Sequence, residues 1–194
     1  LFSNLGVLFT FKYFNFFSNS VSYIVTRFGA EYTLPHHELL LPVGISFYTF
    51  QALNYTIDVY LGQRQAERHF GKFALYIAFF PHLVAGPIVR SEHLLPQFSQ
   101  RHYIDYDRIT SGLRLMAWGF FKKVVIADRI APIVNAVYNN PTNFSGTPLI
   151  VATYLFAIQI YCDFSGYSDI AIGAARVMGY DLTINFRQPY FARS

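Results

Sequence analysis

Long runs without a charged side chain constrain this sequence most. Uncharged windows cover residues 39–57, 73–89 and 130–162, and a weaker apolar run over 2–18 carries Lys12 in its middle. A helix that crosses a hydrocarbon layer of ~30 Å needs about 20 mostly apolar residues. The windows therefore predict an all-α, polytopic helical membrane protein whose first partner is the lipid bilayer.

The charges that remain are few and scattered. Charged residues make up 13% of the chain, and its net charge of +4 forms no basic stripe of the kind that follows a phosphate backbone. We therefore expect no nucleic-acid partner. The single cysteine, Cys162, excludes an intrachain disulfide and a multi-cysteine zinc site. Because His36 and His37 have no further ligand at suitable spacing, we expect no metal.

The window over 130–162 is too long for one simple span. Its middle, residues 139–146, is rich in Asn, Pro, Ser and Gly, which favour a turn. A helix is expected to begin near Thr147 or Pro148, because proline suits a first helical turn. We expect this helix to continue to Cys162 or beyond.

Residues 112–129 differ from the other segments because basic residues interrupt their apolar run. On a straight α-helix, Arg114, Lys122 and Arg129 fall on one edge. This pattern favours a helix that lies in the membrane interface, with its basic side chains extended toward water and Trp118 at headgroup level. The alternative is a transmembrane helix with a basic cluster at its end.

Ionisable residues reappear inside an apolar segment near the end of the chain. Such groups are costly in a membrane and usually face a bundle interior or a water-filled cavity. On a helix, Ser165, Asp169, Gly173 and Arg176 share one stripe, and Asp163 lies two residues before Ser165. The stripe either lines a substrate passage or satisfies groups on neighbouring helices, with small residues allowing close packing.

His82 is the only histidine inside a candidate span. Pro81 precedes it, and Gly86 and Pro87 follow it closely. We therefore expect a broken helix of the kind that lines a cavity. The histidine either contacts substrate or donor there or bonds to carbonyl groups freed near Pro81. The candidate substrate-channel residues are His82, Asp163, Ser165, Tyr167, Asp169, Arg176 and Asn185.

Five motifs, taken in chain order, resemble one protein family. They are Leu41–Gln51 with Ile57–Tyr60, Phe79–Ile88, Lys122–Asp128, Asp163–Asp169 and Asn185–Tyr190. The order is similar to that of the membrane-bound O-acyltransferases, and closest to the bacterial branch that O-acetylates alginate. The resemblance extends from about residue 5 to 194.

The resemblance implies an enzyme that moves an acyl group, usually acetyl, onto hydroxyls of a cell-envelope polysaccharide in exopolysaccharide biosynthesis. It implies an acetyl thioester or an acylated carrier as co-substrate, with no bound cofactor, and a periplasmic or extracellular partner acyltransferase. The expected location is the inner (plasma) membrane, as a multi-pass protein.

The resemblance also bears on the extent of the chain. We expect residues 1–194 to be a single membrane domain, an internal fragment of a longer chain, because the histidines characteristic of the family would follow Ser194. No catalytic residue is therefore assigned within this sequence.

Two alternatives from other functional classes remain at this stage. In an ion or solute transporter, Asp163, Asp169 and Arg176 would line the path together with the broken segment near His82. A non-catalytic scaffold subunit is the other. The order of the five motifs favours the acyltransferase.

Overall fold

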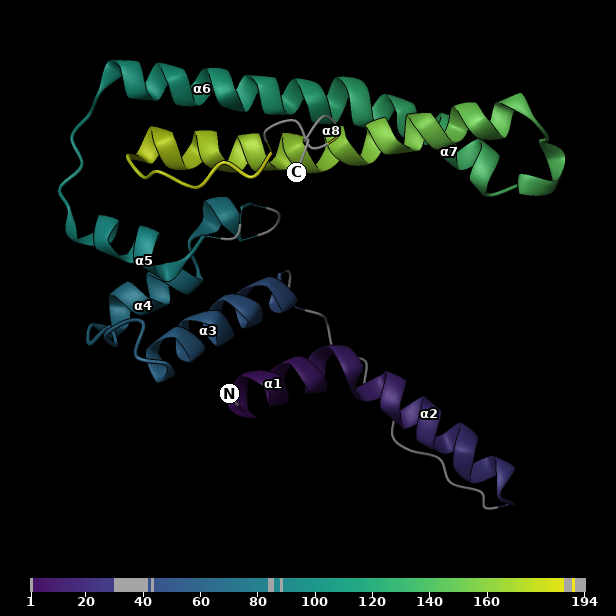
Figure 1. The fold of residues 1–194 in the computed structure, drawn as a ribbon, viewed down its shortest axis with the longest axis horizontal. Coiled ribbons are helices and arrows are strands. Elements are labelled where there is room, and N and C mark those ends of the chain that lie inside the picture. The colour runs from purple at the N-terminus through teal and green to yellow at the C-terminus, as the bar shows by residue number, and fades with distance from the viewer. Residues whose placement is uncertain are drawn as a thin grey trace. The chain divides into compact units, whose positions relative to one another are not determined.

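The computed structural model describes residues 2–29, 42, 44–83, 86–87, 89–186 and 190. In this part of the chain every regular element is a helix (Figure 1), which confirms the all-α prediction. The chain divides into two compact units, residues 1–70 and 71–194, which are described separately. The prediction of a single membrane domain stays a prediction.

The first unit consists of a long helical run and one further helix that packs against its start. Its elements are α1 (Phe2–Leu8), the π-helical η1 (Phe9–Tyr13), α2 (Phe14–Arg27) and α3 (Ile45–Tyr60). The ammonium group of Lys12 donates a hydrogen bond of 3.0 Å to Ser46 Oγ on α3. The charge in the middle of this apolar run therefore has a polar partner.

The second unit contains the elements that carry most of the candidate residues. They are α4 (Phe70–Ile77), η2 (Phe80–His82), α5 (Ser91–Leu94), η3 (Leu95–Ser99), α6 (Tyr106–Phe120), the π-helical η4 (Phe121–Ala127), α7 (Asp128–Tyr138), η5 (Pro141–Asn143) and α8 (Thr147–Met178). The interruption expected around Pro81 is confirmed, because α4 ends at Ile77 and a short 3₁₀ turn follows. The turn over 139–146 and the helix start at Thr147 are also confirmed.

Among the described residues, α8 is the one helix that is long and apolar enough to cross a membrane. It has 32 residues and a mean hydropathy of 1.4 over its most apolar stretch, of which 22% is buried. An apolar helix that stays largely uncovered favours lipid contact over a position in a soluble core. Helix α3, with 16 residues, and α4, with 8, are shorter than a full span. The multi-pass topology therefore stays a prediction.

Helices α6, η4 and α7 follow one another without a break and run antiparallel to α8 (Figure 1). The run begins at a conventional N-cap, since Asp105 Oδ1 accepts a hydrogen bond of 2.8 Å from the backbone amide of Arg108. All three elements pack against α8. This helical pair is the main packing interface of the second unit.

Reciprocal glycine contacts bring the two backbones together. A Cβ added to Gly112 would lie 2.7 Å from the carbonyl oxygen of Gly173, and one added to Gly119 would lie 2.6 Å from that of Gly166. The glycines are seven residues apart on both helices, so they fall on one face of each. Small residues at such positions allow close helix approach inside a membrane. The glycine pairs therefore fix the separation of α6 and α8.

We predict that Gly119→Ala destabilises the protein by about 1–3 kcal/mol, because the new methyl group must push the backbone of α8 away. Gly6→Ala is the matched control, since Gly6 lies in α1 and an added Cβ meets nothing within 4 Å. That change should leave stability unchanged or slightly higher. The measurement is the free energy of unfolding in detergent, and equal effects of the two changes would contradict the close contact.

Candidate functional site

A buried lysine lies at the centre of the interface between η4 and α8. Lys122 Nζ is 2.6 Å from Asp169 Oδ2, and the two side chains are only 9% and 21% exposed. The same ammonium group donates a hydrogen bond of 3.0 Å to Ser165 Oγ, which is fully buried. Both partners lie on α8, one turn apart, so the lysine spans two consecutive turns of that helix.

The next lysine makes a second, more exposed set of contacts. Lys123 Nζ is 2.6 Å from Asp163 Oδ1 on α8 and 2.8 Å from Asp128 Oδ1 at the start of α7. The ammonium group also lies 5.4 Å from the ring centre of Tyr167, within the range of a cation–π contact. Adjacent lysines thus connect η4 to two different carboxylates of α8.

Arg176 extends the polar contacts toward the other end of the pair. Its guanidinium group donates a hydrogen bond of 2.9 Å to Ser111 Oγ on α6. The predicted stripe on α8 is therefore confirmed as a contact face: its hydroxyl, carboxylate, glycine and guanidinium all meet α6 or η4. We call these groups, with Lys122, Lys123 and Asp163, the polar seam.

The prediction that Lys122 shares an outward polar edge with Arg114 and Arg129 is wrong. Arg114 and Arg129 are exposed, but Lys122 is buried against α8. The prediction assumed a straight α-helix, whereas residues 121–127 are π-helical, and i→i+5 bonding changes the angle between successive side chains. The carboxylate of Asp169 then offers the lysine a partner inside the interface.

The chemistry of this cluster is that of an ion pair rather than an activated nucleophile. A lysine that serves as base for a serine must be neutral. Lys122 instead lies 2.6 Å from the carboxylate of Asp169 and donates a hydrogen bond to Ser165. The cluster therefore holds the two helices in register and neutralises Asp169.

Two of the seven candidate residues lie away from the seam. His82 is completely buried in η2, which packs against α8, and its ring centre is 5.5 Å from that of Phe79. Asn185 is exposed in the segment that folds back along α8. Phe186 anchors that segment, with its ring centre 5.2 Å from that of Phe164. The structure thus places Ser165, Asp169 and Asp163 at the two lysines, with Tyr167 beside Lys123, and places Arg176 further along the same interface.

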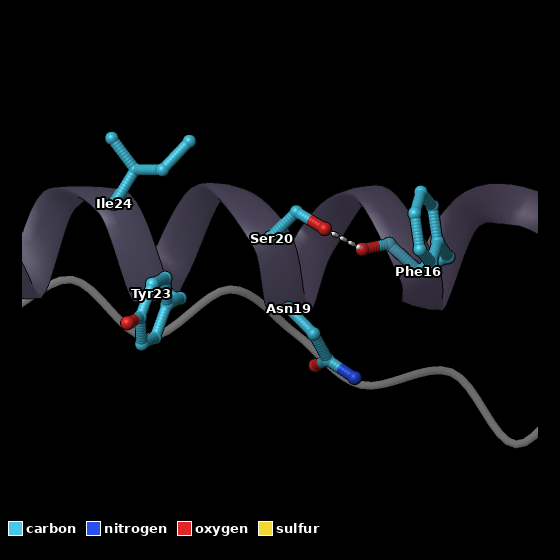
Figure 2. A pocket seen from close by; sticks show the side chains of 5 residues that line it. All are labelled: Phe16, Asn19, Ser20, Tyr23 and Ile24. Carbon is cyan, nitrogen blue, oxygen red and sulfur yellow. Dashed lines mark hydrogen bonds between the residues drawn. The ribbon is translucent and has the colours of Figure 1, made fainter.

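A hollow lies elsewhere, along α2. It has a volume of about 420 Å³, and Figure 2 shows the side chains that line it, Phe16, Asn19, Ser20, Tyr23 and Ile24. The hydroxyl of Ser20 already donates a hydrogen bond of 2.8 Å to the carbonyl oxygen of Phe16. Its lining lacks the carboxylates and basic groups found at the polar seam, so it is a weaker candidate for chemistry.

Metal ligands do not cluster in the part of the chain that the structure describes, where no three His, Cys, Asp or Glu side chains come together. His36 and His37 lie outside the described residues.

The candidate list drawn from the sequence omitted Lys122, Lys123 and Ser168. Lys122 and Lys123 carried a usable signal, because two lysines in one apolar segment and two aspartates in another need partners. Ser168 carried no such signal. It is 1% exposed, and its hydroxyl makes no hydrogen bond to the described residues.

We predict that Asp169→Ala lowers the free energy of unfolding by about 3 kcal/mol, because the change leaves Lys122 buried without its counter-ion. Asp169→Asn should recover more than half of that loss, since the amide oxygen still accepts a hydrogen bond from the ammonium group. The measurement is detergent unfolding of the purified protein at its full natural length.

The control for this prediction is the exposed pair of Arg90 and Glu92, whose side chains are 76% and 72% exposed at 3.7 Å. Glu92→Ala should cost less than about 1 kcal/mol. If Asp169→Ala costs no more than Glu92→Ala, the seam does not contribute to stability as described.

Comparison with known proteins gives matches along nearly the whole chain. It is 42% identical over 191 residues to "Probable alginate O-acetylase AlgI" of Azotobacter vinelandii, covering 98% of this chain and 38% of that protein. It is 34% identical over 218 residues to "Peptidoglycan O-acetyltransferase" of Helicobacter pylori, covering 99% and 40%. It is 25% identical over 166 residues to "Teichoic acid D-alanyltransferase" of Bacillus subtilis, covering 82% and 41%.

The chain thus spans about two fifths of the length of these relatives. No family model matches it.

Proposed function

We propose, starting from the fact that this chain belongs to the membrane-bound O-acyltransferase-like family, that its natural protein transfers acetyl groups to hydroxyls of a cell-envelope polysaccharide such as alginate. The observation that carries the proposal is the 42% identity over 98% of the chain to an alginate O-acetylase. More distant relatives, named for peptidoglycan and teichoic acid, also act on cell-envelope polymers. The relatives therefore support a cell-envelope polymer as the acceptor class more strongly than they support alginate in particular.

The proposed reaction needs an acyl donor and a polysaccharide acceptor. The donor would be an acetyl thioester or an acylated carrier, and the protein would need no bound cofactor. A periplasmic or extracellular acyltransferase would complete delivery to the polysaccharide. The protein itself would be a multi-pass component of the inner membrane. The apolar, largely uncovered α8 supports a membrane position.

The polar seam has a positioning role in this proposal. Its ion pairs and hydrogen bonds hold α6 and η4 against α8, so they fix the register of these helices. The buried His82 is not assigned as the base. We assign no catalytic residue among the described residues.

The pairing of the carboxylates argues against the transporter alternative. An ion path requires acidic groups that can exchange their partner for the transported ion. Asp163 and Asp169 each lie 2.6 Å from a lysine ammonium group, and Asp169 is largely buried. Both carboxylates are neutralised by the fold, which favours a structural role for them.

The test is the acetyl content of the envelope polysaccharide in the source cells. Disrupting the gene for the full-length protein should remove most of the alkali-labile acetyl from one envelope polymer, and a plasmid copy should restore it. Release by mild alkali identifies the ester linkage that transfer to a hydroxyl produces.

Membrane vesicles that contain the protein serve as the control for the alternative. The proposal predicts no protein-dependent ion or solute flux across them. Unchanged acetyl content in every envelope polymer, accompanied by such a flux, would refute the proposal in favour of a transporter.

A further inference from the structure

We propose that Arg108 and Arg176 form a phosphate-binding site where the start of α6 meets the end of α8. The phosphate would belong either to a phospholipid headgroup or to the phosphate-bearing part of an acyl donor. The second of these sources rests on the function proposed above, whereas the site itself and the first source do not.

The two arginines lie at the same end of the antiparallel helical pair (Figure 1). Arg108 lies in the first turn of α6, and Arg176 lies in the last turn of α8. Arg176 Nη1 donates a hydrogen bond of 2.9 Å to Ser111 Oγ, and Ser111 follows Arg108 by less than one helical turn. A Cβ added to the adjacent Gly112 would lie 2.8 Å from Val177 Cγ2, so the helices are in close contact here. Both arginines are half-buried.

Neither guanidinium group forms an ion pair with the residues that the structure describes. The partner of Arg176 is a neutral hydroxyl group. Arg108 Nη2 donates a hydrogen bond of 2.5 Å to the carbonyl oxygen of Tyr103, while its buried Nε donates to none of the described residues. The lysines of the polar seam differ, because Lys122 and Lys123 each meet a carboxylate at 2.6 Å. A guanidinium group that is half-buried without a counter-ion is costly.

The carboxylates near this end of the pair do not neutralise the two arginines. Asp105 Oδ1 accepts a hydrogen bond from the backbone amide of Arg108, as the N-cap of α6. Asp107 and Asp181 are exposed, and neither forms an ion pair within the described part of the chain. A bound anion would neutralise the arginines instead.

Phosphate is the anion that fits this arrangement best. A guanidinium group presents its N–H groups in a planar fork that matches two oxygens of a phosphate. Arg108 also lies among the first backbone amides of α6, where the helix dipole favours negative charge. A phosphate group offers oxygens to both forks at once, whereas a chloride ion does not.

The first test measures phosphate binding by the full-length protein, purified in detergent and stripped of lipid. Inorganic phosphate should raise its melting temperature in a saturable manner, compared with sodium chloride at the same ionic strength. In the double variant Arg108→Gln/Arg176→Gln the half-saturating phosphate concentration should rise about tenfold or more, because charge-assisted hydrogen bonds are lost. The matched control is Arg114→Gln/Arg129→Gln, which removes two exposed arginines and should leave that concentration unchanged.

Two results of this test would overturn the proposal. Absence of a phosphate effect in the unaltered protein would show that Arg176 only offsets the dipole at the end of α8, or that a carboxylate elsewhere in the full-length protein pairs with the arginines. Equal losses in the two double variants would show that phosphate responds to net charge alone.

Arg176→Lys keeps the proposal testable where the double variant fails to fold. This change preserves the charge and removes the planar fork, so the half-saturating phosphate concentration should rise severalfold. An unchanged concentration would show that Arg176 does not bind the phosphate, and would overturn the site as described.

The second test distinguishes the two sources of the phosphate. One arm adds phosphatidylglycerol to the detergent micelles, with the phosphate-free diacylglycerol as its control. The other arm adds coenzyme A, with the phosphate-free pantetheine as its control. The source is the probe that raises the melting temperature of the unaltered protein but not that of Arg108→Gln/Arg176→Gln.

Stabilisation by neither probe would show that the site takes an adventitious ion only, and would overturn the proposal. The inorganic phosphate and lipid measurements require no acyl transfer. Unchanged acetyl content in the envelope polymers would therefore refute the proposed function without deciding the outcome of these binding measurements.

Discussion

Charged side chains within apolar helices need partners, and the rest of the second unit is arranged around that requirement. Lys122 meets it with a carboxylate at 2.6 Å and a buried serine hydroxyl, both supplied by α8. An unpaired ammonium group in such a position would be strongly destabilising. The partners come from a helix more than forty residues later in the chain, so the pairing fixes which helices pack together and in which register.

The glycine pairs make this pairing possible. Because Gly112 and Gly119 have no side chains, the carbonyl oxygens of Gly173 and Gly166 can lie directly against α6. The two helix backbones are then close enough for a lysine on one to form a short ion pair with an aspartate on the other. The π-helical segment supplies the second condition. It turns Lys122 toward α8, while Arg114 and Arg129, at either side of that segment, stay exposed. Close approach, altered helical pitch and ion pairing therefore support one another.

The sequence predicts helices, the break near Pro81 and the start of α8 because each follows from local residue chemistry: charge-free length, proline and turn-forming residues. It also predicts the shared stripe of Ser165, Asp169 and Arg176, because α8 is regular there. The face on which Lys122 lies could not be predicted from a helical wheel of about 100° per residue, because no local sequence signal marks the π-helical segment. The residues on α6 and η4 that contact this stripe could not be predicted either, because those contacts depend on how segments distant in the sequence pack together.

The central claim is that Lys122 and Asp169 form one coupled unit, and a double-mutant cycle tests it most directly. The cycle compares the free energies of unfolding of Lys122→Met, Asp169→Leu and the double variant in the full-length protein. The account predicts that each single change is costly and that the double variant recovers about 2 kcal/mol relative to the sum of the two. Losses that simply add would show that the two residues do not interact, and would contradict the polar seam.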